Sequence, residues 1–445
     1  MLKVPVRVTN ASLHRFKKRP RIYLPACVGA LLFLSVTVSA QVREVLTLER
    51  CIALALENSE LIKITAEGVV AAKGMKQEAF GRFLPSLDMA GSYTQIPEVP
   101  EIMGFKMGDE DNYSAKLTLA QPLFTWGKIR QGYRQAGLRH GIAAETYRKD
   151  KNEMVLNVKK MFYAVLLSGQ IKNISEEARD VMKRHYEVTQ ALYREGKVSN
   201  LDVSRVKVQM INSSTRLIKA ENELVIAKKA LLNLINYCPD DDWEAESKLP
   251  DISGEDSRPM AELVSEAIKS RPEMKNASSQ KEIAKCLVKL ARAQNRPNLA
   301  LIGNYEYTKP YNFVNEWDSS WNVTCALTFP LFNGLSNFGR IQQAKAGLQQ
   351  TTLGENLLKK NIKLEVEKAE LDRRNAAERV EAQKENVKTA KENMDIVQKR
   401  YEQGLVSDLE LRDTQLALTQ AETEYSTALF DLNIAQAELE KAIGE

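Results

Sequence analysis

The stretches "YREGKVSNL" (193–201) and "YEQGLVSDL" (401–409) are two copies of one short turn, 208 residues apart in a chain of 445. Gly196 and Gly404 suit the end of a helix, because glycine adopts the left-handed conformation at little cost. We therefore predict two equivalent helix–turn–helix tips. Their shared positions are Tyr193, Gly196, Val198, Ser199 and Leu201 in the first tip, and Tyr401, Gly404, Val406, Ser407 and Leu409 in the second.

Polar residues after each glycine can cap the start of a second helix. The candidates are Ser199 or Asn200 in the first tip and Ser407 or Asp408 in the second. Long proline-free segments lead into both tips, and at 1.5 Å per residue each spans roughly 100 Å. Four long helices are predicted in all: 127–194, 200–236, 337–401 and 408–443.

Two further motifs recur at nearly the same interval. They are Pro-x-Leu-x-x-x-Gly-x-Tyr at 85–93 and 297–305, and Pro-Leu-Phe at 122–124 and 330–332. Three markers in one order at one period indicate a duplicated unit of about 200 residues. We therefore expect a first repeat over 41–250 and a second over 251–445.

Each predicted repeat contains a pair of strands after an initial helical segment. The helical segments are 47–82 and 260–295, the second broken at Pro272. Apolar and polar residues then alternate over about ten positions, which predicts strands with one apolar face. These strands are expected at 86–95, 113–121, 298–308 and 320–329.

Small and apolar residues recur about every 3.5 positions along 362–401. This period is typical of a coiled-coil seam, and its alanines let neighbouring helices approach closely. Arg373 and Gln383 interrupt the pattern. The expected architecture is therefore mainly α, with long helical hairpins and a small β part.

Residues 1–40 resemble a secretory signal, with seven basic residues before an apolar run that ends at Ala40. A retained membrane anchor is the alternative. Without these seven, 56 of the 63 basic residues remain against 58 acidic ones, a net charge of −2, so nucleic-acid binding loses its electrostatic support. The four cysteines beyond the signal form no Cys-x-x-Cys pair and require no disulfide.

The alternating strands pose a further question, since a soluble coiled-coil protein does not need them. After residue 40 no apolar run reaches 18 residues, so a closed β-barrel is the membrane-spanning structure that remains. A small soluble sheet covered by helices is the alternative. Because barrels begin at eight strands, four strands per chain require a barrel shared by two or three copies.

These markers together resemble the TolC family of outer-membrane efflux proteins over residues 45–443. The resemblance rests on "LTLERCIALALENSE" (46–60), the Pro-x-Leu motif, "QPLFTWGK" (121–128), "FPLFNG" (329–334) and the paired tips. It implies a homotrimer with a twelve-stranded barrel in the outer membrane of a Gram-negative bacterium and an α-barrel in the periplasm.

The resemblance also implies partners and a role. They are a periplasmic adaptor, an inner-membrane pump or ABC transporter, and outer-membrane lipid. The chain would be the passive exit duct of a tripartite efflux pump or type I secretion system, conducting drugs, ions or polypeptides. Adaptor contacts would fall on the tip residues, and no cofactor, metal or nucleic acid is implied.

The family's gate and clasp can be placed on this sequence by the same resemblance. The gate carboxylates correspond to Glu410 and Asp413, whose i, i+3 spacing puts them on one helical face. The clasp between hairpins corresponds to a hydrogen bond between Tyr401 and Asp202. The basic residue that the family places after the second tip glycine is absent, because Val406 stands there.

Other functions find less support in the residues. His14, His140 and His185 have no metal-ligand spacing, and no nucleophile or phosphate-loop motif occurs, so an enzyme is not expected. A periplasmic adaptor or a soluble scaffold is the alternative function, although an adaptor would carry one hairpin instead of two. Transported substrate, pump class and adaptor cannot be read from the sequence.

Overall fold

The computed structural model describes residues 44–102, 105–106, 108–239, 243–245, 248–252, 258–312, 314–403 and 405–444. The predicted signal 1–40 and Gly404 lie outside them. In chain order the elements are β1 (Glu44–Leu46), α1 (Leu48–Asn58), α2 (Glu60–Gly81), β2 (Ser86–Gln95), β3 (Glu101–Ile102), β4 (Phe105–Lys106), β5 (Asp111–Phe124), α3 (Lys128–Arg194), α4 (Asn200–Ile235), β6 (Trp243–Ala245), α5 (Met260–Ser270), α6 (Pro272–Ala293), β7 (Asn298–Lys309), β8 (Asp318–Thr328), α7 (Ser336–Glu402) and α8 (Asp408–Ile443).

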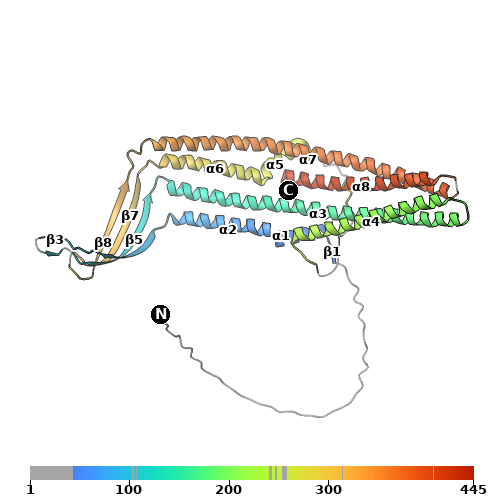
Figure 1. Ribbon diagram of the computed structural model, residues 1–445. Helices are drawn as coiled ribbons and strands as arrows, with labels where there is room; N and C mark the ends of the chain where they lie inside the picture. Colours follow the sequence, from blue (N-terminus) through green and yellow to red (C-terminus); the bar gives the residue numbers. More distant parts are fainter. Residues whose placement is uncertain are drawn as a thin grey trace, which may run out of the picture. The chain divides into compact units, whose positions relative to one another are not determined.

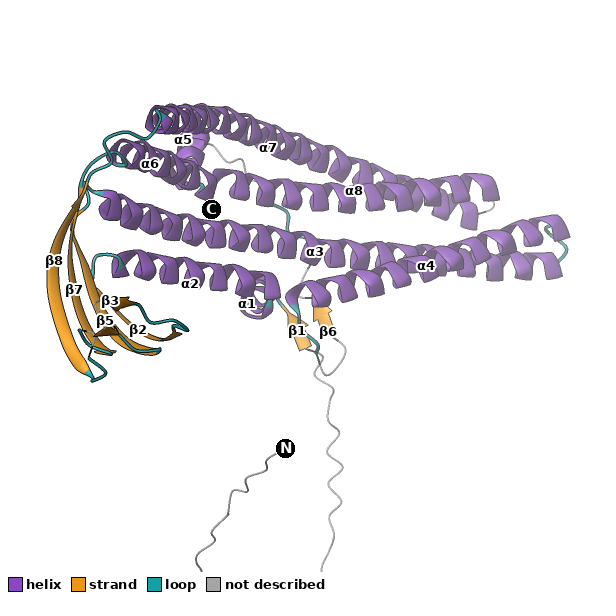
Figure 2. Ribbon diagram, turned by 60° about the vertical axis from the view of Figure 1, so that its left-hand side comes forward, coloured by secondary structure: helices purple, strands orange, loops and turns teal. Residues whose placement is uncertain are grey.

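Two long hairpins, α3 with α4 and α7 with α8, contain nearly half of the chain. Figure 1 shows the turns of both hairpins at one end and the four long strands at the other. Nearer the strands, α2, α3, α6 and α7 lie side by side in that order (Figure 2). The pattern of two helical hairpins with paired strands was predicted from the sequence.

The four long strands form one antiparallel sheet in the order β2-β5-β7-β8. Residues directly opposite each other share a face, and Met89, Leu117, Tyr305 and Trp321 form one such row across the sheet. These apolar side chains are exposed, Met89 and Trp321 by about three quarters (76% and 75%). One face of the sheet is therefore apolar and uncovered in the single chain.

Hydrogen-bonded polar side chains occupy the other face. Thr118 donates to the Asn304 side chain (3.0 Å), and Asn304 donates to Asn322 (3.0 Å). Ser114 donates to Glu306 (3.1 Å) on the same face. The sheet is thus apolar on one side and polar on the other, as the alternation predicted.

The second strand is longer than the predicted 113–121. β5 continues through Pro122, which lies opposite Ala300, and ends at Phe124 after a register shift. Proline cannot donate to the ladder, but a bulge beside it tolerates the missing N–H group. The predicted helix 47–82 is also divided, because Ser59 has an extended ψ of 125° between α1 and α2.

The main hydrophobic core lies where the hairpins meet α1 and the short β1–β6 pair. Its fully buried members include Cys51, Val158, Leu231 and Leu432. A smaller core joins α5 to α7 and α8 around Leu263. In the described helices, none is both long enough and apolar enough to cross a membrane.

The predicted seam of α7 is buried at several positions, including Ile362, Val366 and Val380. The interruption at Arg373 is an ion pair within the helix. Arg373 is 4% exposed and donates from Nε to Glu370 at 2.9 Å, and Glu370 is 1% exposed. A charged pair therefore replaces an apolar contact in the seam, and breaking one partner would leave the other charge buried.

Candidate functional site at the hairpin tips

The first tip is a tight turn between α3 and α4. Gly196 has a φ of +75°, and the Lys197 N–H donates to the Leu192 carbonyl at 2.9 Å. This left-handed residue lets the last carbonyls of α3 find partners, as the sequence predicted. Ser199 caps α4 by accepting from the Asp202 N–H (3.2 Å), while the Asp202 carboxylate accepts from the Ser199 N–H and hydroxyl (3.1 and 2.6 Å).

The second tip follows a similar course between α7 and α8. The Leu405 N–H donates to the Arg400 carbonyl (2.9 Å), and Ser407 caps α8 by accepting from the Glu410 N–H (3.3 Å). Val406 is half-buried and packs against a small apolar cluster that contains Val397 and Leu411. The valine found where the family places a basic residue thus contributes to packing.

A buried histidine joins the two hairpins near these turns. His185 of α3 is 7% exposed, and its Nε2 lies 2.8 Å from the Tyr401 hydroxyl of α7. The same nitrogen lies 3.1 Å from Oδ1 of Asp408, the first residue of α8. The Tyr401 and His185 rings meet edge to face, with centroids 5.1 Å apart. One side chain of the first hairpin therefore contacts both helices of the second.

The geometry indicates which tautomer of His185 forms this junction. Nε2 faces the Asp408 carboxylate, which accepts hydrogen bonds only, so the tautomer that carries its proton on Nε2 can donate to it. Burial lowers the pKa of His185 below its usual value of 6.5, although the Asp408 charge opposes this shift. The resting junction is therefore a neutral imidazole that bridges a tyrosine and a carboxylate.

The predicted clasp residues have other partners in the single chain. Tyr401 contacts His185, whereas Asp202 is held in its own turn by Ser199. Those hydrogen bonds lower the pKa of Asp202, as expected for a carboxylate that accepts N–H and O–H donors. The structure thus brings Tyr401 to the first hairpin through a residue other than Asp202.

The predicted gate carboxylates lie on the first turns of α8. Glu410 and Asp413 are both exposed and line a groove of about 730 Å³ together with Arg400 of α7. Asp413 lies 3.3 Å from its neighbour Arg412. Both carboxylates are thus on the surface of one chain, at the tip end of the molecule, with Arg400 and Arg412 nearby.

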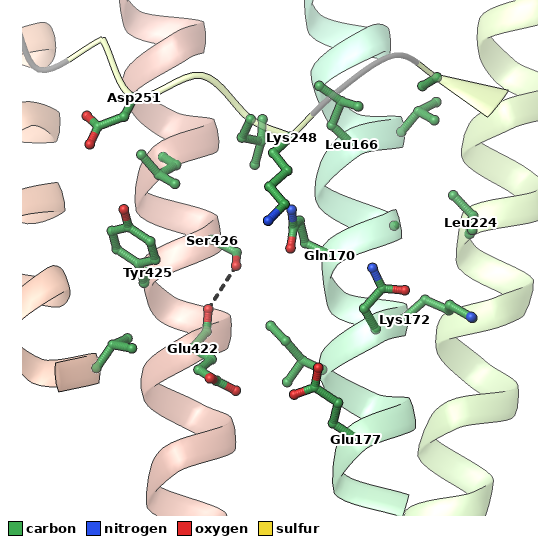
Figure 3. Close-up of a pocket in the computed structure, with 18 of the residues that line it drawn as sticks. Leu166, Gln170, Lys172, Glu177, Leu224, Lys248, Asp251, Glu422, Tyr425 and Ser426 are labelled. Carbon is green, nitrogen blue, oxygen red and sulfur yellow. Dashed lines mark hydrogen bonds between the residues drawn. The ribbon is translucent and has the colours of Figure 1, made fainter. Parts of the chain in front are cut away.

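A cavity of about 840 Å³, lined by both apolar and charged side chains, lies between the hairpins on the strand side of this junction. Figure 3 shows that Lys248, Gln170, Glu422 and Glu177 point into the space between α3 and α8. Four lysines and four acidic residues line it, so the cavity has no dominant sign of charge. Its apolar lining, such as Val165 and Leu429, belongs to the main core.

The contact between His185 and Asp408 was not predicted from the sequence. Histidines were expected only as possible metal ligands, and Asp408 only as a helix cap. A signal was present, because His185 lies eight residues before Tyr193 and so on the last turns leading to the tip. No pattern within one hairpin, however, reveals a contact with the other.

The His185 junction predicts that acid weakens contact between the hairpins. Because the pKa is lowered in the folded chain, the contribution of neutral His185 is complete above pH 6.5 and is lost as the pH falls through 6.5. Between pH 8 and pH 5.5 the thermal midpoint of the wild type should therefore fall more than that of His185→Gln. The control His140→Gln, on the same helix, should keep the wild-type response. Equal falls in wild type and His185→Gln would contradict the assignment.

Comparison with known proteins identifies the family. The profile of the outer membrane efflux protein family matches residues 51–237 and 263–445. The chain is 22% identical over 403 residues to the outer membrane protein TolC of Escherichia coli K12, covering 87% of this chain and 80% of TolC. It is also 22% identical over 407 residues to the alkaline protease secretion protein AprF of Pseudomonas aeruginosa, covering 87% and 82%.

Solved structures show the same fold. The CmeC outer membrane channel of Campylobacter jejuni superposes with a TM-score of 0.75 at 18% identity, covering 89% of this chain and 85% of CmeC. These matches confirm the resemblance and the fold class predicted from the sequence. They also confirm the predicted class of function, efflux or secretion at the Gram-negative outer membrane. The chain belongs to the outer membrane efflux protein family.

Proposed function

We propose that three copies of this chain form a passive exit duct, with a shared twelve-stranded barrel in the outer membrane and an α-barrel in the periplasm. The duct would serve a tripartite efflux pump or a type I secretion system and would perform no covalent chemistry. A periplasmic adaptor and an inner-membrane pump or ABC transporter would complete the assembly.

The sheet is the observation that carries this proposal. It has an apolar, exposed face and a hydrogen-bonded polar face, and its edge strands β2 and β8 each have one neighbour. Pairing β8 of one copy with β2 of the next would satisfy both edges. The apolar faces would then meet lipid, and the polar faces would line the pore.

The helical part supports two equivalent repeats, 41–250 and 251–445, in the same assembly. α3 and α7 each have 67 residues, and α4 and α8 each have 36. Hairpins of equal length place their tips at the same distance from the sheet. Six such hairpins around an axis would make a tube of constant length.

Exposed apolar residues at the tips provide a surface for the adaptor. Tyr193, Leu201 and Leu409 are 45%, 59% and 55% exposed although they lie at the turns. Scattered exposed residues need no explanation, but Leu201 and Leu409 occupy matching positions of the two tips, and both are exposed. We propose that they, with the capped turns themselves, form the adaptor contact.

The cargo would be set by the pump. The efflux family and the similarity to AprF, an alkaline protease secretion protein, make small molecules and polypeptides the two candidate classes of cargo. In a trimer, Glu410 and Asp413 would place six carboxylates around the tip opening. Such a ring favours cations through its focused field.

Planar-bilayer recording tests the duct and this ring together. Purified protein should form cation-selective channels, because the carboxylates concentrate cations at the opening. Glu410→Ala with Asp413→Ala should lower the cation conductance and reduce cation selectivity, because fewer cations then gather at the opening. The matched pair Glu221→Ala with Glu223→Ala, exposed on α4, should change neither. Absence of channels would overturn the duct, whereas unchanged selectivity would overturn only the ring.

The tip junction gives a second prediction for the same recordings. His185→Gln and Tyr401→Phe should each raise the closed-state conductance, by about 2- to 10-fold, which is the usual weight of one hydrogen bond. Asp202→Asn removes the carboxylate of the predicted clasp while keeping the size of the α4 cap. If Asp202→Asn opens the channel as much as Tyr401→Phe does, the clasp includes Asp202 in the trimer. If Tyr401→Phe has no effect, Tyr401 has no part in closure.

A further inference from the structure

A row of basic residues follows α6 toward the sheet. Lys285, Lys289, Arg292 and Arg296 are spaced by four, three and four residues, and all are exposed. Such spacing puts side chains on one face of a helix. Although α6 ends at Ala293, the Arg296 N–H donates to the Ala293 carbonyl (3.1 Å), so the backbone turns once more through Arg296. We call these four residues the cationic row.

Most of the charge in the cationic row has no ion-pair partner among the residues that the structure describes. Glu282 lies 2.6 Å from Lys285 and 2.9 Å from Arg134. Within the described residues, no carboxylate lies within ion-pair distance of Lys289, Arg292 or Arg296. Glu282 is the acidic neighbour of Lys285 and Arg134 and also feels the charge of Lys289, so the row keeps a net positive charge that is available to an external anion.

The neighbouring helices α3 and α7 also carry basic residues at their N-terminal ends, where acidic residues would stabilise a helix. α3 and α7 begin at this end of the molecule, and neither has an acidic residue in its first turn. They carry Arg130, Arg134 and Arg340 instead, close to the positive end of each helix dipole. Helix stability thus gives no reason for the basic residues of α3 and α7.

A chain of ring contacts connects the cationic row to the apolar face of the sheet. The Arg296 guanidinium lies 5.3 Å from the Trp126 ring centroid. Trp126 meets Phe124 edge to face, with centroids 5.2 Å apart, and Phe124 lies opposite Leu299 in the sheet. Leu299 in turn lies opposite Leu327, which is 68% exposed. The Arg296 end of the cationic row therefore lies next to the helix-proximal end of the apolar face.

We propose that the cationic row binds the phosphate groups of anionic phospholipids in the periplasmic leaflet of the outer membrane. This inference rests on the proposed insertion of the sheet in that membrane. The order along the surface is an apolar face, then Trp126, then arginine and lysine. Hydrocarbon, interface and headgroup phosphates follow one another in the same order in a bilayer.

The dimensions of the cationic row fit this role. From Lys285 to Arg296 it extends roughly 16 Å, at 1.5 Å per residue. A headgroup layer is about 6 Å thick on each side of a bilayer. Arg296 and Arg292 would therefore contact phosphates directly, whereas Lys289 would attract them across about one Debye length of 8 Å.

An anionic cargo in the pore is the other occupant that this charge could serve. It would require the cationic row to face the lumen, on the side of the polar Thr118 and Asn304. The contacts through Trp126 and Phe124 place the row on the opposite, apolar side. The lipid leaflet is thus the partner that the structure favours.

Native mass spectrometry of the full mature protein tests the proposal by counting bound phosphatidylglycerol and phosphatidylcholine. Preparations are first shown to form channels, so that a failure of the duct is recognised separately. The wild type should bind phosphatidylglycerol more tightly, and added salt should reduce the preference. Lys289→Gln with Arg292→Gln and Arg296→Gln should reduce it by roughly tenfold or more, since each basic residue near a lipid surface contributes about fivefold.

Two matched variants separate the cationic row from charge in general. Lys207→Gln with Arg216→Gln and Lys229→Gln removes three exposed charges from α4 and should keep the preference. Lys289→Arg with Arg292→Lys and Arg296→Lys retains the charge and should also keep it. The proposal would be overturned if the α4 variant lost the preference for phosphatidylglycerol. It would also be overturned if the glutamine variant of the cationic row kept that preference. A glutamine variant that alters only ion selectivity would overturn it as well, because that result would place the row in the pore.

Discussion

The unsatisfied edges of a four-stranded sheet are the constraint on which the rest of this molecule depends. β2 and β8 have a neighbour on one side only, and one face of the sheet presents exposed side chains such as Met89 and Trp321. A bilayer offers no water to the free N–H and carbonyl groups of an edge. A barrel built from the strands of several copies would pair the free backbone groups of β2 and β8 with each other, and lipid would cover the apolar face. We propose a shared barrel for this reason.

The two hairpins of each copy would combine with those of the other copies in the periplasm, as the strands do in the membrane. Because each strand pair leads into a hairpin of the same length, pooling the strands also arranges the helices around one axis. The main core holds the hairpins together near α1, whereas the tips depend on a few contacts around His185, Tyr401 and Asp408. A cavity lies between the hairpins on the strand side of these tip contacts, and the main core provides part of its lining.

Much of this architecture could be predicted because its signals are local. Gly196 and Ser199 predict a turn through left-handed backbone and side-chain capping, and alternation predicts the faces of the strands. Contacts between distant elements left no such signal. The bulge that carries β5 past Pro122, the buried Arg373 and the His185 junction all depend on partners that only the fold supplies. The gate and clasp residues came from family resemblance alone, and the single chain leaves them as proposals.

The mass of the detergent-purified protein, recovered from the outer-membrane fraction and weighed by mass photometry, tests the shared barrel most directly. Four strands per chain and twelve in the barrel require a particle with three times the mass of one chain. Covalent crosslinks between introduced cysteines on β2 and β8 should then join different copies. A stable, water-soluble particle with the mass of one chain would contradict the account.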